Sequence, residues 1–391
     1  MDQRFFAQMR NLHLQVWHTD GKRLEVTADN HLATLTLLAA PKLNNLVLHP
    51  NSHLRLLIIC FCPLTGLTEQ IINLQELNVL KIENCRLSGT FNLAELVVLQ
   101  NLTTFSLEAN KLTEVILRLD ATTDGMESKL VILNLSSNRI KHFNLDVLRS
   151  FPAIKELHLF RNSLVTIDGT VYLPVLNTLD VRENLLTELD LSGCACGALV
   201  NVYALYNNLT SFPVFNESTV NIKVLDLSNN RLTTVSGKEL QKQQQLTSLL
   251  LSSNALRHFT TDDDDDVGSD LEIELPSLDM LALQSNRLES LDLRGWKLPM
   301  LHTLHVILNP LKSIPDNLHE RYPKLNKLIC FCPDIECGWI QRNVQHVQQG
   351  SYEMSVARGR PGAVGSSHRC VTVPYVGCVR CAANQTKPKE E

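Results

Sequence analysis

One pattern of apolar and polar places recurs along most of the chain. In each copy of eleven residues, apolar side chains stand at the first, fourth, sixth and eleventh places, and asparagine is preferred at the ninth. The copy that begins at Leu102 has Phe105, Leu107, Asn110 and Leu112 at these places. The copies begin at Met9, Leu32, Leu54, Leu77, Leu102, Leu130, Ile154, Leu176, Leu199, Ile222, Leu246, Leu278 and Leu301. Chance does not hold so many apolar residues in one phase, so the chain is a series of repeats.

Each copy predicts a short strand whose alternate residues point inward. One turn cannot bury its apolar face alone, so consecutive turns stack and share a core. This is the pattern of leucine-rich repeats. It predicts an α/β solenoid: a leucine-rich-repeat horseshoe with a parallel concave β-sheet and short irregular or helical convex segments. The connecting segments 112–115, 186–189 and 232–235 are too short for long helices, and only Gly237–Gln245 predicts a helical turn.

The ninth place divides the copies into two groups. An inward asparagine can bond backbone groups that the bend leaves unpaired. The ninth-place residues of consecutive copies form a stack that we call the ladder. Cysteine can replace asparagine there as a small buried residue, so Cys62 and Cys85 have a structural interpretation as ladder residues. Their equivalent places in adjacent copies allow a disulfide between them without requiring one. In chain order, the ninth places hold Trp17, Ala40, Cys62, Cys85, Asn110, Asn138, Asn162, Asn184, Asn207, Asn230, Asn254, Asn286 and Asn309.

Composition and charge exclude several classes of function. Aromatic residues make up only 5% of the chain, so its 44% hydrophobic content is mainly aliphatic. A net charge of −5 gives no basic footprint for a nucleic acid. No run of apolar residues is long enough to span a membrane. Familiar catalytic and phosphate-binding motifs are missing, so we expect neither an enzyme, nor a cofactor, nor a metal.

Two clusters of chemistry-bearing residues have simple interpretations. The insertion 260–275 carries five consecutive acids, Asp262–Asp266. Unspaced acids favour a solvated loop over a calcium site. In Cys194-Ala195-Cys196, one intervening residue is unfavourable for a bridge within the pair. A disulfide to another cysteine, or two free thiols, is expected there rather than a metal site.

Cysteines gather near the C-terminus. Six of the eleven follow residue 329: Cys330, Cys332, Cys337, Cys370, Cys378 and Cys381. Such a cluster indicates disulfides in an oxidising compartment. Because eleven is odd, at least one cysteine has no partner within the chain.

The order Cys330-x-Cys332, Trp339, Cys370, Cys378 resembles a known capping module. It is similar to the cysteine-rich C-terminal flanking module of extracellular leucine-rich-repeat proteins, among them Slit-like, chaoptin-like and Toll-receptor ectodomains. The resemblance implies the pair Cys330–Cys370, and Cys332 with Cys378 or Cys381. Cys337 and one further cysteine depart from the four-cysteine pattern of that module.

These features predict a division of the chain. We expect a solenoid over 1–329, a cysteine-rich cap over 330–381 and a polar tail over 382–391. The first repeat begins at Met9 without a capping cysteine pair or a signal peptide before it. We therefore expect that the sequence lacks its natural beginning. Glycosylation is predicted at the sequons of Asn101, Asn134, Asn208, Asn216 and Asn384.

Places three, five, seven and eight of each copy face outward on the concave sheet. Exposed aromatic residues beside arginine and acids are typical of an interface hot spot. Three consecutive copies have this composition. The candidate ligand-binding residues are His158, Phe160, Arg161, Asp180, Arg182, Glu183, Tyr203, Leu205 and Tyr206. The outward residues Leu56, Ile58 and Phe61 are apolar. They either pack under a missing N-terminal part or form a second contact surface.

The sequence thus favours extracellular recognition of a protein or microbial ligand, of the innate-immune type. The expected location is secreted, or in an ectodomain whose anchor lies elsewhere. Pairing with another leucine-rich-repeat chain is a further expected mode of binding. The alternatives are a cell-adhesion or structural protein, and a cytosolic scaffold that regulates a partner enzyme. Function on such a scaffold resides in the variable face, so the fold does not name the ligand.

Overall fold

The computed structural model describes residues 12–18, 20–28, 31–50, 53–65, 69–259, 272–332, 335–354, 368–374 and 376–382. The chain divides into two units, and each consists of stacked turns. Unit 1 comprises residues 1–202 and 214–219. Unit 2 comprises residues 203–213 and 220–391. The predicted acidic loop, Asp262–Asp266, lies outside the described residues.

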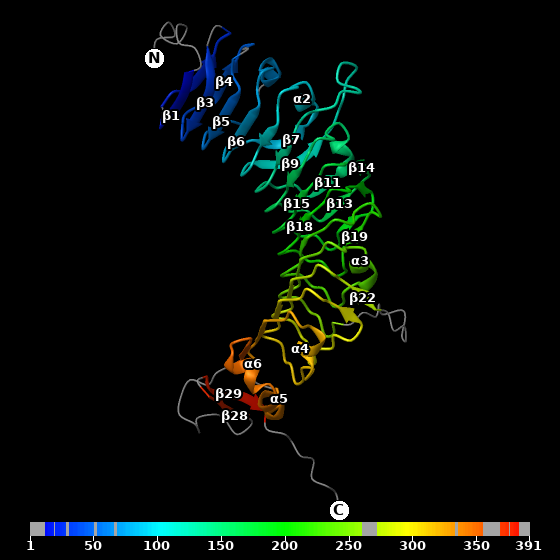
Figure 1. Ribbon diagram of the computed structural model, residues 1–391. Coiled ribbons are helices and arrows are strands. Elements are labelled where there is room, and N and C mark those ends of the chain that lie inside the picture. The colour runs from blue at the N-terminus through cyan, green and yellow to red at the C-terminus, as the bar shows by residue number, and fades with distance from the viewer. Residues whose placement is uncertain are drawn as a thin grey trace, which may run out of the picture. The chain divides into compact units, whose positions relative to one another are not determined.

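Unit 1 is built on a parallel sheet in which successive turns contribute successive strands (Figure 1). Residues of the fourth place pair with one another, as Leu133 does with Phe105 and Leu157. Its strands among the described residues are β1 (Leu12–Trp17), β3 (Leu32–Leu38), β5 (Leu56–Cys60), β6 (Val79–Glu83), β8 (Thr104–Ser106), β10 (Ile132–Asn134), β12 (Glu156–His158), β15 (Thr178–Asp180) and the first two residues of β18 (Asn201–Tyr203).

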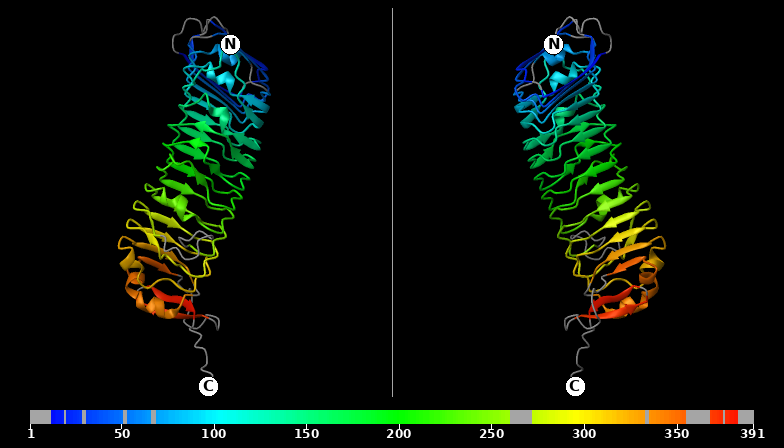
Figure 2. Two further views of the ribbon diagram at one scale, coloured as in Figure 1. Left: turned by 90° about the vertical axis from the view of Figure 1, so that its right-hand side faces the viewer. Right: turned by 90° about the vertical axis from the view of Figure 1, so that its left-hand side faces the viewer.

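Unit 2 has the same construction (Figures 1 and 2). Its parallel strands among the described residues are β20 (Val224–Asp226), β21 (Ser248–Leu250), β23 (Met280–Ala282), β25 (Thr303–His305), β26 (Lys327–Cys330) and β27 (Tyr352–Met354). The parallel sheet thus continues to β27, and the predicted boundary at 329 stays a prediction. Strands β28 (His368–Val373) and β29 (Gly377–Ala382) form an antiparallel pair.

Shorter elements form the other side of the turns. In unit 1, the paired outer strands are β2 (Arg23–Val26) with β4 (Asn45–Leu48), β7 (Ser88–Asn92) with β9 (Lys111–Ile116), β11 (His142–Asn144) with β13 (Thr166–Asp168), β14 (Val171–Tyr172) with β17 (Cys194–Ala195) and β16 (Asp190–Leu191) with β19 (Val214–Phe215). Unit 1 also has η1 (Glu69–Asn73), α2 (Ala94–Val97) and η2 (Leu145–Leu148). Unit 2 has the strand pair β22 (Ile273–Glu274) with β24 (Trp296–Lys297), and the helices α3 (Gly237–Gln241), α4 (Leu318–Arg321), α5 (Cys337–Arg342) and α6 (Val344–Gln348).

The predicted helical turn is α3. Ser236 begins it, because its hydroxyl accepts a hydrogen bond from the Glu239 amide at 3.3 Å. The expectation that no other connecting segment is helical was wrong, since η1, α2 and η2 are single helical turns. Each of these three buries at least one apolar residue, such as Ile71, Leu96 and Leu148. A single helical turn is too short to show a helical period of apolar residues, so the sequence pattern does not predict it.

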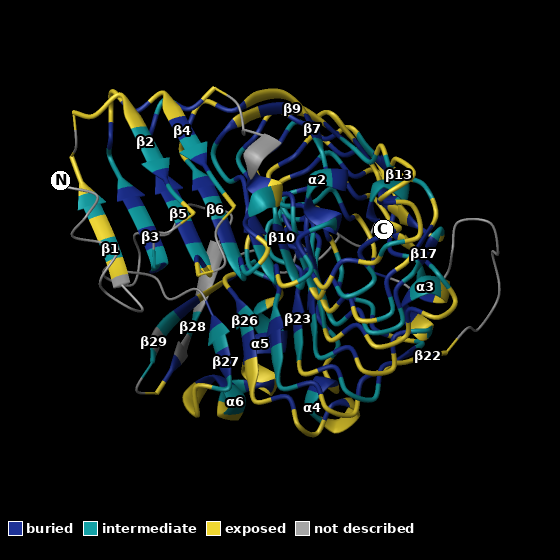
Figure 3. Cartoon of the chain, turned by 90° about the horizontal axis from the view of Figure 1, so that it is seen from above, coloured by how far each residue is buried: buried dark blue, intermediate teal, exposed yellow. Residues whose placement is uncertain are grey.

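The core lies inside each turn, and exposed residues lie mainly at the rim of the turns (Figure 3). Residues at the fourth and sixth places are buried, while the outward residues between them are half-buried, as in β12. The repeating bend after the sheet strands from β1 to β25 has a left-handed residue at the eighth place, such as Ser137, Arg161 and Leu308. None of these residues is β-branched, as expected where a positive φ is sterically costly.

Asparagine at the ninth place forms hydrogen bonds with backbone groups, as predicted, and these bonds link consecutive turns. The Asn138 amide donates to the Leu107 carbonyl of the preceding turn at 2.9 Å and to the Leu135 carbonyl of its own turn at 3.0 Å. Its carbonyl oxygen accepts from the Leu112 amide at 3.0 Å. One side chain thereby satisfies buried backbone groups in two turns.

The predicted register of the first copy was wrong by two residues. In β1, Leu14 pairs with Leu35 and Val16 with Leu37, so these two residues hold the fourth and sixth places. Trp17 consequently stays on the outward side and is 59% exposed. The run Leu12-x-Leu14-x-Val16 offers two pairs of alternating aliphatic residues. A slip by two keeps the same face inward, so the pattern alone does not choose between them.

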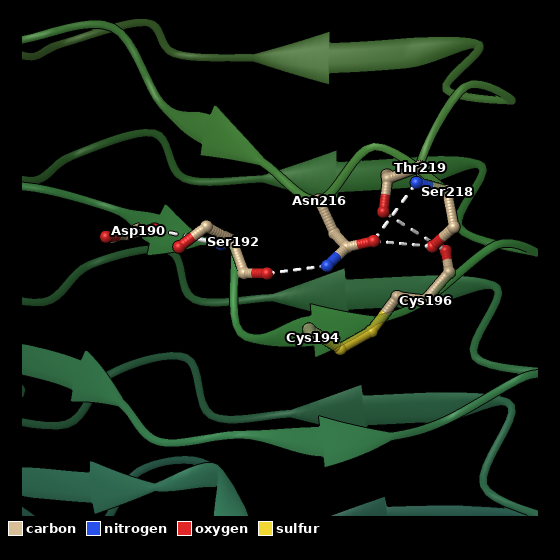
Figure 4. Close-up of a disulfide and its surroundings, with 7 residues drawn as sticks. All are labelled: Asp190, Ser192, Cys194, Cys196, Asn216, Ser218 and Thr219. Atoms are coloured by element: carbon tan, nitrogen blue, oxygen red, sulfur yellow. Dashed lines mark hydrogen bonds between the residues drawn. A yellow bond between two sulfur atoms is a disulfide. The ribbon is translucent and has the colours of Figure 1, made fainter.

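Cys194 and Cys196 are joined by a disulfide (Figure 4), contrary to the expectation that a bridge within this pair is unfavourable. The chain turns sharply at Ala195, where the Cys196 amide donates to the Cys194 carbonyl at 2.9 Å. This three-residue turn brings the two Cα atoms to 5.3 Å. That separation lies within the range of disulfides.

The pairing that the capping-module resemblance implied was also wrong. Cys330 is bonded to Cys332, two residues away, with a Cα separation of 5.2 Å. Cys337 is bonded to Cys381. The second pair follows from the backbone, because a bridge between Glu336 and Ala382 places the neighbouring cysteines side by side. Cys378 is disulfide-bonded as well, whereas the side chain of Cys370 lies outside the described part.

Candidate binding face

The structure places six of the nine candidate residues on the outward side of the unit 1 sheet, which we call the strand face. His158 belongs to β12, and Phe160 and Arg161 follow that strand. Asp180 belongs to β15, and Arg182 and Glu183 follow it in the same way. The repeat therefore brings two triplets with matching places next to each other, because β12 and β15 are neighbours in register.

Asp180 is the centre of a polar cluster on this face. Its side chain is only 3% exposed. Arg182 donates to both carboxylate oxygens, from Nε at 2.8 Å and from Nη2 at 2.6 Å. His158 lies between two carboxylates, with Nε2 3.1 Å from Glu156 Oε2 and Nδ1 3.8 Å from Asp180 Oδ2. The arginine and histidine together surround a carboxylate that water hardly reaches.

Aromatic and ionic contacts extend the cluster. The Arg182 guanidinium carbon lies 5.4 Å from the centre of the Phe160 ring. That distance is within cation–π range. Arg161 and Glu183 form a separate exposed pair, with Nε 2.7 Å from Oε2. Both of these residues are at the eighth place of their copies and have left-handed backbones.

Contacts within the cluster shift the pKa of two groups. The Asp180 carboxylate, 3.8 Å from Nδ1, raises the pKa of His158, and burial opposes this shift. Burial would raise the pKa of the Asp180 carboxyl, but the neighbouring His158 and the hydrogen bonds from Arg182 outweigh burial and hold that pKa below its ordinary value. The cluster thus favours an ionised aspartate and a protonated histidine.

The other three candidate residues lie in unit 2. Tyr203 and Leu205 are half-buried, and Tyr206 is 55% exposed. Tyr206 is at the eighth place of its copy and has φ 55°. The sequence could therefore identify its outward direction, and its exposure agrees with that direction.

Two apolar groups on outward places complete the description. In unit 1, Phe61 is 60% exposed, beside the half-buried Leu56 and Ile58 that the pattern had marked as apolar. In unit 2, Leu308 is 70% and Phe331 47% exposed, and the sequence reasoning missed both. Leu308 stands at an eighth place, so the repeat template was the signal that could have found it.

The predicted glycosylation sites differ in their surroundings. Asn134 lies on the strand face, where its amide donates to Glu108 Oε2 at 2.9 Å. Asn216 donates to the Ser192 carbonyl at 2.6 Å, as Figure 4 shows, and Asn101 donates to the Gln75 carbonyl at 3.1 Å. Asn208 is half-buried, and Asn384 is outside the described residues. Glycosylation stays a prediction at all five sites.

The described part of the chain lacks two kinds of feature. No group of three or more histidine, cysteine or acidic side chains there could hold a metal ion. Within the same residues, no helix combines the length and the apolar character needed to cross a membrane.

Comparisons with known proteins agree with the stacked-turn architecture. The family model described as Leucine Rich Repeat matches residues 221–242. No curated protein matches the sequence. The chain is similar in structure to the leucine-rich repeat domain of APL1, at 16% identity and a TM-score of 0.66, with 98% of this chain and 93% of that chain covered.

Two solved complexes contain further similar chains. One is the LRIM1/APL1C complex, at 19% identity and a TM-score of 0.59, covering 91% of this chain and 60% of that chain. The other is the octameric complex of Latrophilin 3, Unc5D and FLRT2, at 17% identity and a TM-score of 0.55, covering 78% and 90%. At these identities, the likeness concerns the fold alone. The repeats, the parallel sheets and these likenesses identify the fold of this chain as that of leucine-rich-repeat solenoids.

Proposed function

We propose that this chain is an extracellular recognition protein, of the innate-immune type, that binds a protein or microbial ligand through its strand face. The observation that carries the proposal is the cluster around Asp180. His158 and Arg182 lie against Asp180, Glu156 lies against His158, and Phe160 lies against Arg182. The cluster thus combines an aromatic ring with positive and negative groups. Preorganised aromatic and arginine side chains are typical of interface hot spots.

The location outside the cell is supported by the cysteines. Disulfides join Cys194 to Cys196, Cys330 to Cys332, and Cys337 to Cys381. Such bonds persist in oxidising compartments and are rare in the cytosol. Two of the structurally similar chains named above occur in complexes with other proteins, which favours protein recognition as the use of this face.

The chain offers a matched pair of variants for testing the strand face. Arg182 and Arg294 each form a salt bridge with an aspartate two residues earlier. Arg294 lies in a segment before the outer strand β24, and it is not on the sheet. Arg182→Ala changes the proposed binding face, whereas Arg294→Ala removes the same kind of ion pair elsewhere.

The experiment uses the chain secreted from insect cells. Fluorescently labelled protein is tested for binding to killed Gram-negative and Gram-positive bacteria and to an array of purified extracellular proteins. We expect saturable binding to at least one probe, reduced about tenfold or more by Arg182→Ala and unchanged by Arg294→Ala. Equal binding by both variants and the unmodified chain would place recognition elsewhere. Failure to secrete a chain with intact disulfides would favour the cytosolic scaffold instead.

A further inference from the structure

Unit 1 contains a cluster of three unbonded thiols in its early turns. Cys60, Cys62 and Cys85 are free and buried. Every other cysteine whose side chain the structure describes is in a disulfide. These thiols play no part in the proposed binding face, so their arrangement needs its own explanation.

Cys62 and Cys85 stand at the ninth places of consecutive turns. Their strands are β5 and β6, in which Cys60 pairs directly with Glu83. The Phe61 amide then donates to the Glu83 carbonyl at 3.2 Å, so the register continues beyond the strands. Equivalent places of neighbouring parallel strands are about 4.8 Å apart. Disulfides span Cα separations of about 4.4–6.8 Å.

The thiols leave the ladder weak at this point. In the next turn, the Asn110 amide donates to the Ile82 carbonyl at 2.7 Å and its oxygen accepts from the Leu87 amide at 3.2 Å. The Cys85 thiol is 3.8 Å from the corresponding carbonyl, that of Ile59. A thiol is a weak donor with one hydrogen. Hydrogen bonding through the ladder side chain therefore links these two turns less firmly than the later ones.

We propose that Cys62 and Cys85 are a latent cross-link of the ladder: oxidation joins their sulfur atoms and ties the two turns where the asparagine hydrogen bonds are missing. A small disulfide such as oxidised glutathione is the oxidant. One thiolate attacks it and releases one glutathione. The second thiolate attacks the resulting mixed disulfide and releases the other. The two cysteines lose two electrons and two protons, and glutathione disulfide becomes two thiols.

Burial accounts for the reduced state of this pair. It raises the pKa of Cys62 and, with smaller contributions from nearby groups that include Cys62, raises that of Cys85 to about 12. Only a thiolate attacks a disulfide, so few molecules are reactive near neutral pH. The cross-link should therefore form slowly, and at pH values below the pKa each unit increase in pH should make it form about tenfold faster.

Cys60 is a competitor for the same partner. The sequence Cys-Phe-Cys-Pro occurs at 60–63 and again at 330–333, where Cys330 and Cys332 are bonded. The backbones differ at the central residue, because Phe61 is left-handed, with φ 57°, and Phe331 is not among the left-handed residues. Cys60 sits on the outward side, with its thiol 3.9 Å from Glu83 Oε2, while Cys62 turns into the ladder.

Digestion with trypsin distinguishes a bond between Cys62 and Cys85 from a bond between Cys60 and Cys62. Cleavage after Arg55, Lys81 and Arg86 puts Cys60 and Cys62 on one peptide and Cys85 on another. The full-length chain is incubated with oxidised glutathione at pH 8.5, in urea concentrations from zero to just below unfolding, then alkylated and digested without reduction. Mass spectrometry reports the linked peptides, and urea ensures that the thiols become accessible.

Two serine variants complete the test. In Cys60→Ser, we expect a linked pair of these peptides and the loss of both remaining alkylatable thiols. In Cys62→Ser, which keeps Cys60 and Cys85, we expect no linked pair. The proposal is overturned if the thiols of Cys60→Ser react only as separate glutathione adducts, if they stay free at every urea concentration, or if the unmodified chain bonds Cys60 to Cys62.

Discussion

Two aspartate–arginine pairs make the same contact in different regions of the molecule. In each pair, the guanidinium donates hydrogen bonds to both oxygens of the carboxylate two residues earlier. One pair is Asp180-Val-Arg182 on the strand face of unit 1, and the other is Asp292-Leu-Arg294 near the outer strands of unit 2. The Asp180 side chain is 3% exposed, whereas that of Asp292 is 34% exposed. The short motif determines the ion pair, and the neighbouring turn determines how much water reaches it.

The neighbouring turn also determines what holds each carboxylate ionised. The pKa of Asp292 is lowered first by the hydrogen bond from Arg294, and burial opposes this only in part. At Asp180, burial is the largest single influence and acts in the opposite direction, and His158 and Arg182 together outweigh it. A buried ion pair of this kind gives little net stability, but removing one partner leaves a costly charge.

The largest expected effect is therefore that of Arg182→Ala. It leaves a buried carboxylate with only His158 beside it, and we expect a loss of about 2 kcal/mol in the free energy of unfolding. Arg294→Ala should leave that free energy unchanged within error, because Asp292 can rehydrate. Urea titration followed by circular dichroism measures both. Equal losses in the two variants would refute the importance of burial in this comparison.

Removing Asp180 should lower the free energy of unfolding less than removing Arg182. Asp180→Ala leaves Arg182, whose side chain is 42% exposed and can regain water. We expect a loss of about 1 kcal/mol, which is smaller than that of Arg182→Ala. The same urea titrations measure the difference. A larger loss for Asp180→Ala than for Arg182→Ala would mean that the carboxylate organises the cluster, for example by holding His158.

The first pair shows how much of the fold the sequence could predict. Periodicity identified the solenoid and the ladder, since apolar side chains and asparagine must recur wherever turns stack. It placed His158 and Asp180 at matching outward places, and β12 and β15 bring them together. It could not predict the register of β1, where Leu12, Leu14 and Val16 alternate and two alignments bury equivalent faces.

Other features depend on contacts that no repeat template contains. The bond between Cys194 and Cys196 depends on a tight turn at Ala195, and that between Cys337 and Cys381 depends on the bridge from Glu336 to Ala382. The near-complete burial of Asp180 results from side chains of its own turn and of the preceding one. Outward direction follows from spacing, but exposure follows from the neighbours.

Because His158 titrates, the free energy that the Asp180 cluster contributes to folding should depend on pH. The pKa of His158 is raised in the folded chain above the ordinary value of 6.5, first by the Asp180 carboxylate 3.8 Å from Nδ1. A raised histidine pKa adds stability that is complete below the unfolded value and is lost as pH rises through the folded value. We expect unfolding curves of the unmodified chain to show this loss from pH 6.5 upward. The loss should be smaller in His158→Gln. An unchanged pH profile in that variant would assign the loss to another group.

The smallest expected effect concerns the cation–π contact between Arg182 and Phe160 in the first pair. The Arg182 guanidinium lies 5.4 Å from the Phe160 ring centre, and such a contact at a partly exposed site contributes about 0.5 kcal/mol. Phe160→Leu keeps an apolar side chain but removes the ring. Phe160→Leu should lower the free energy of unfolding by about 0.5 kcal/mol more in the unmodified chain than in the Arg182→Ala variant, because only the unmodified chain contains the cation. Equal costs in the two backgrounds would mean that Phe160 merely packs there. The arginine would then be held in place by Asp180 alone.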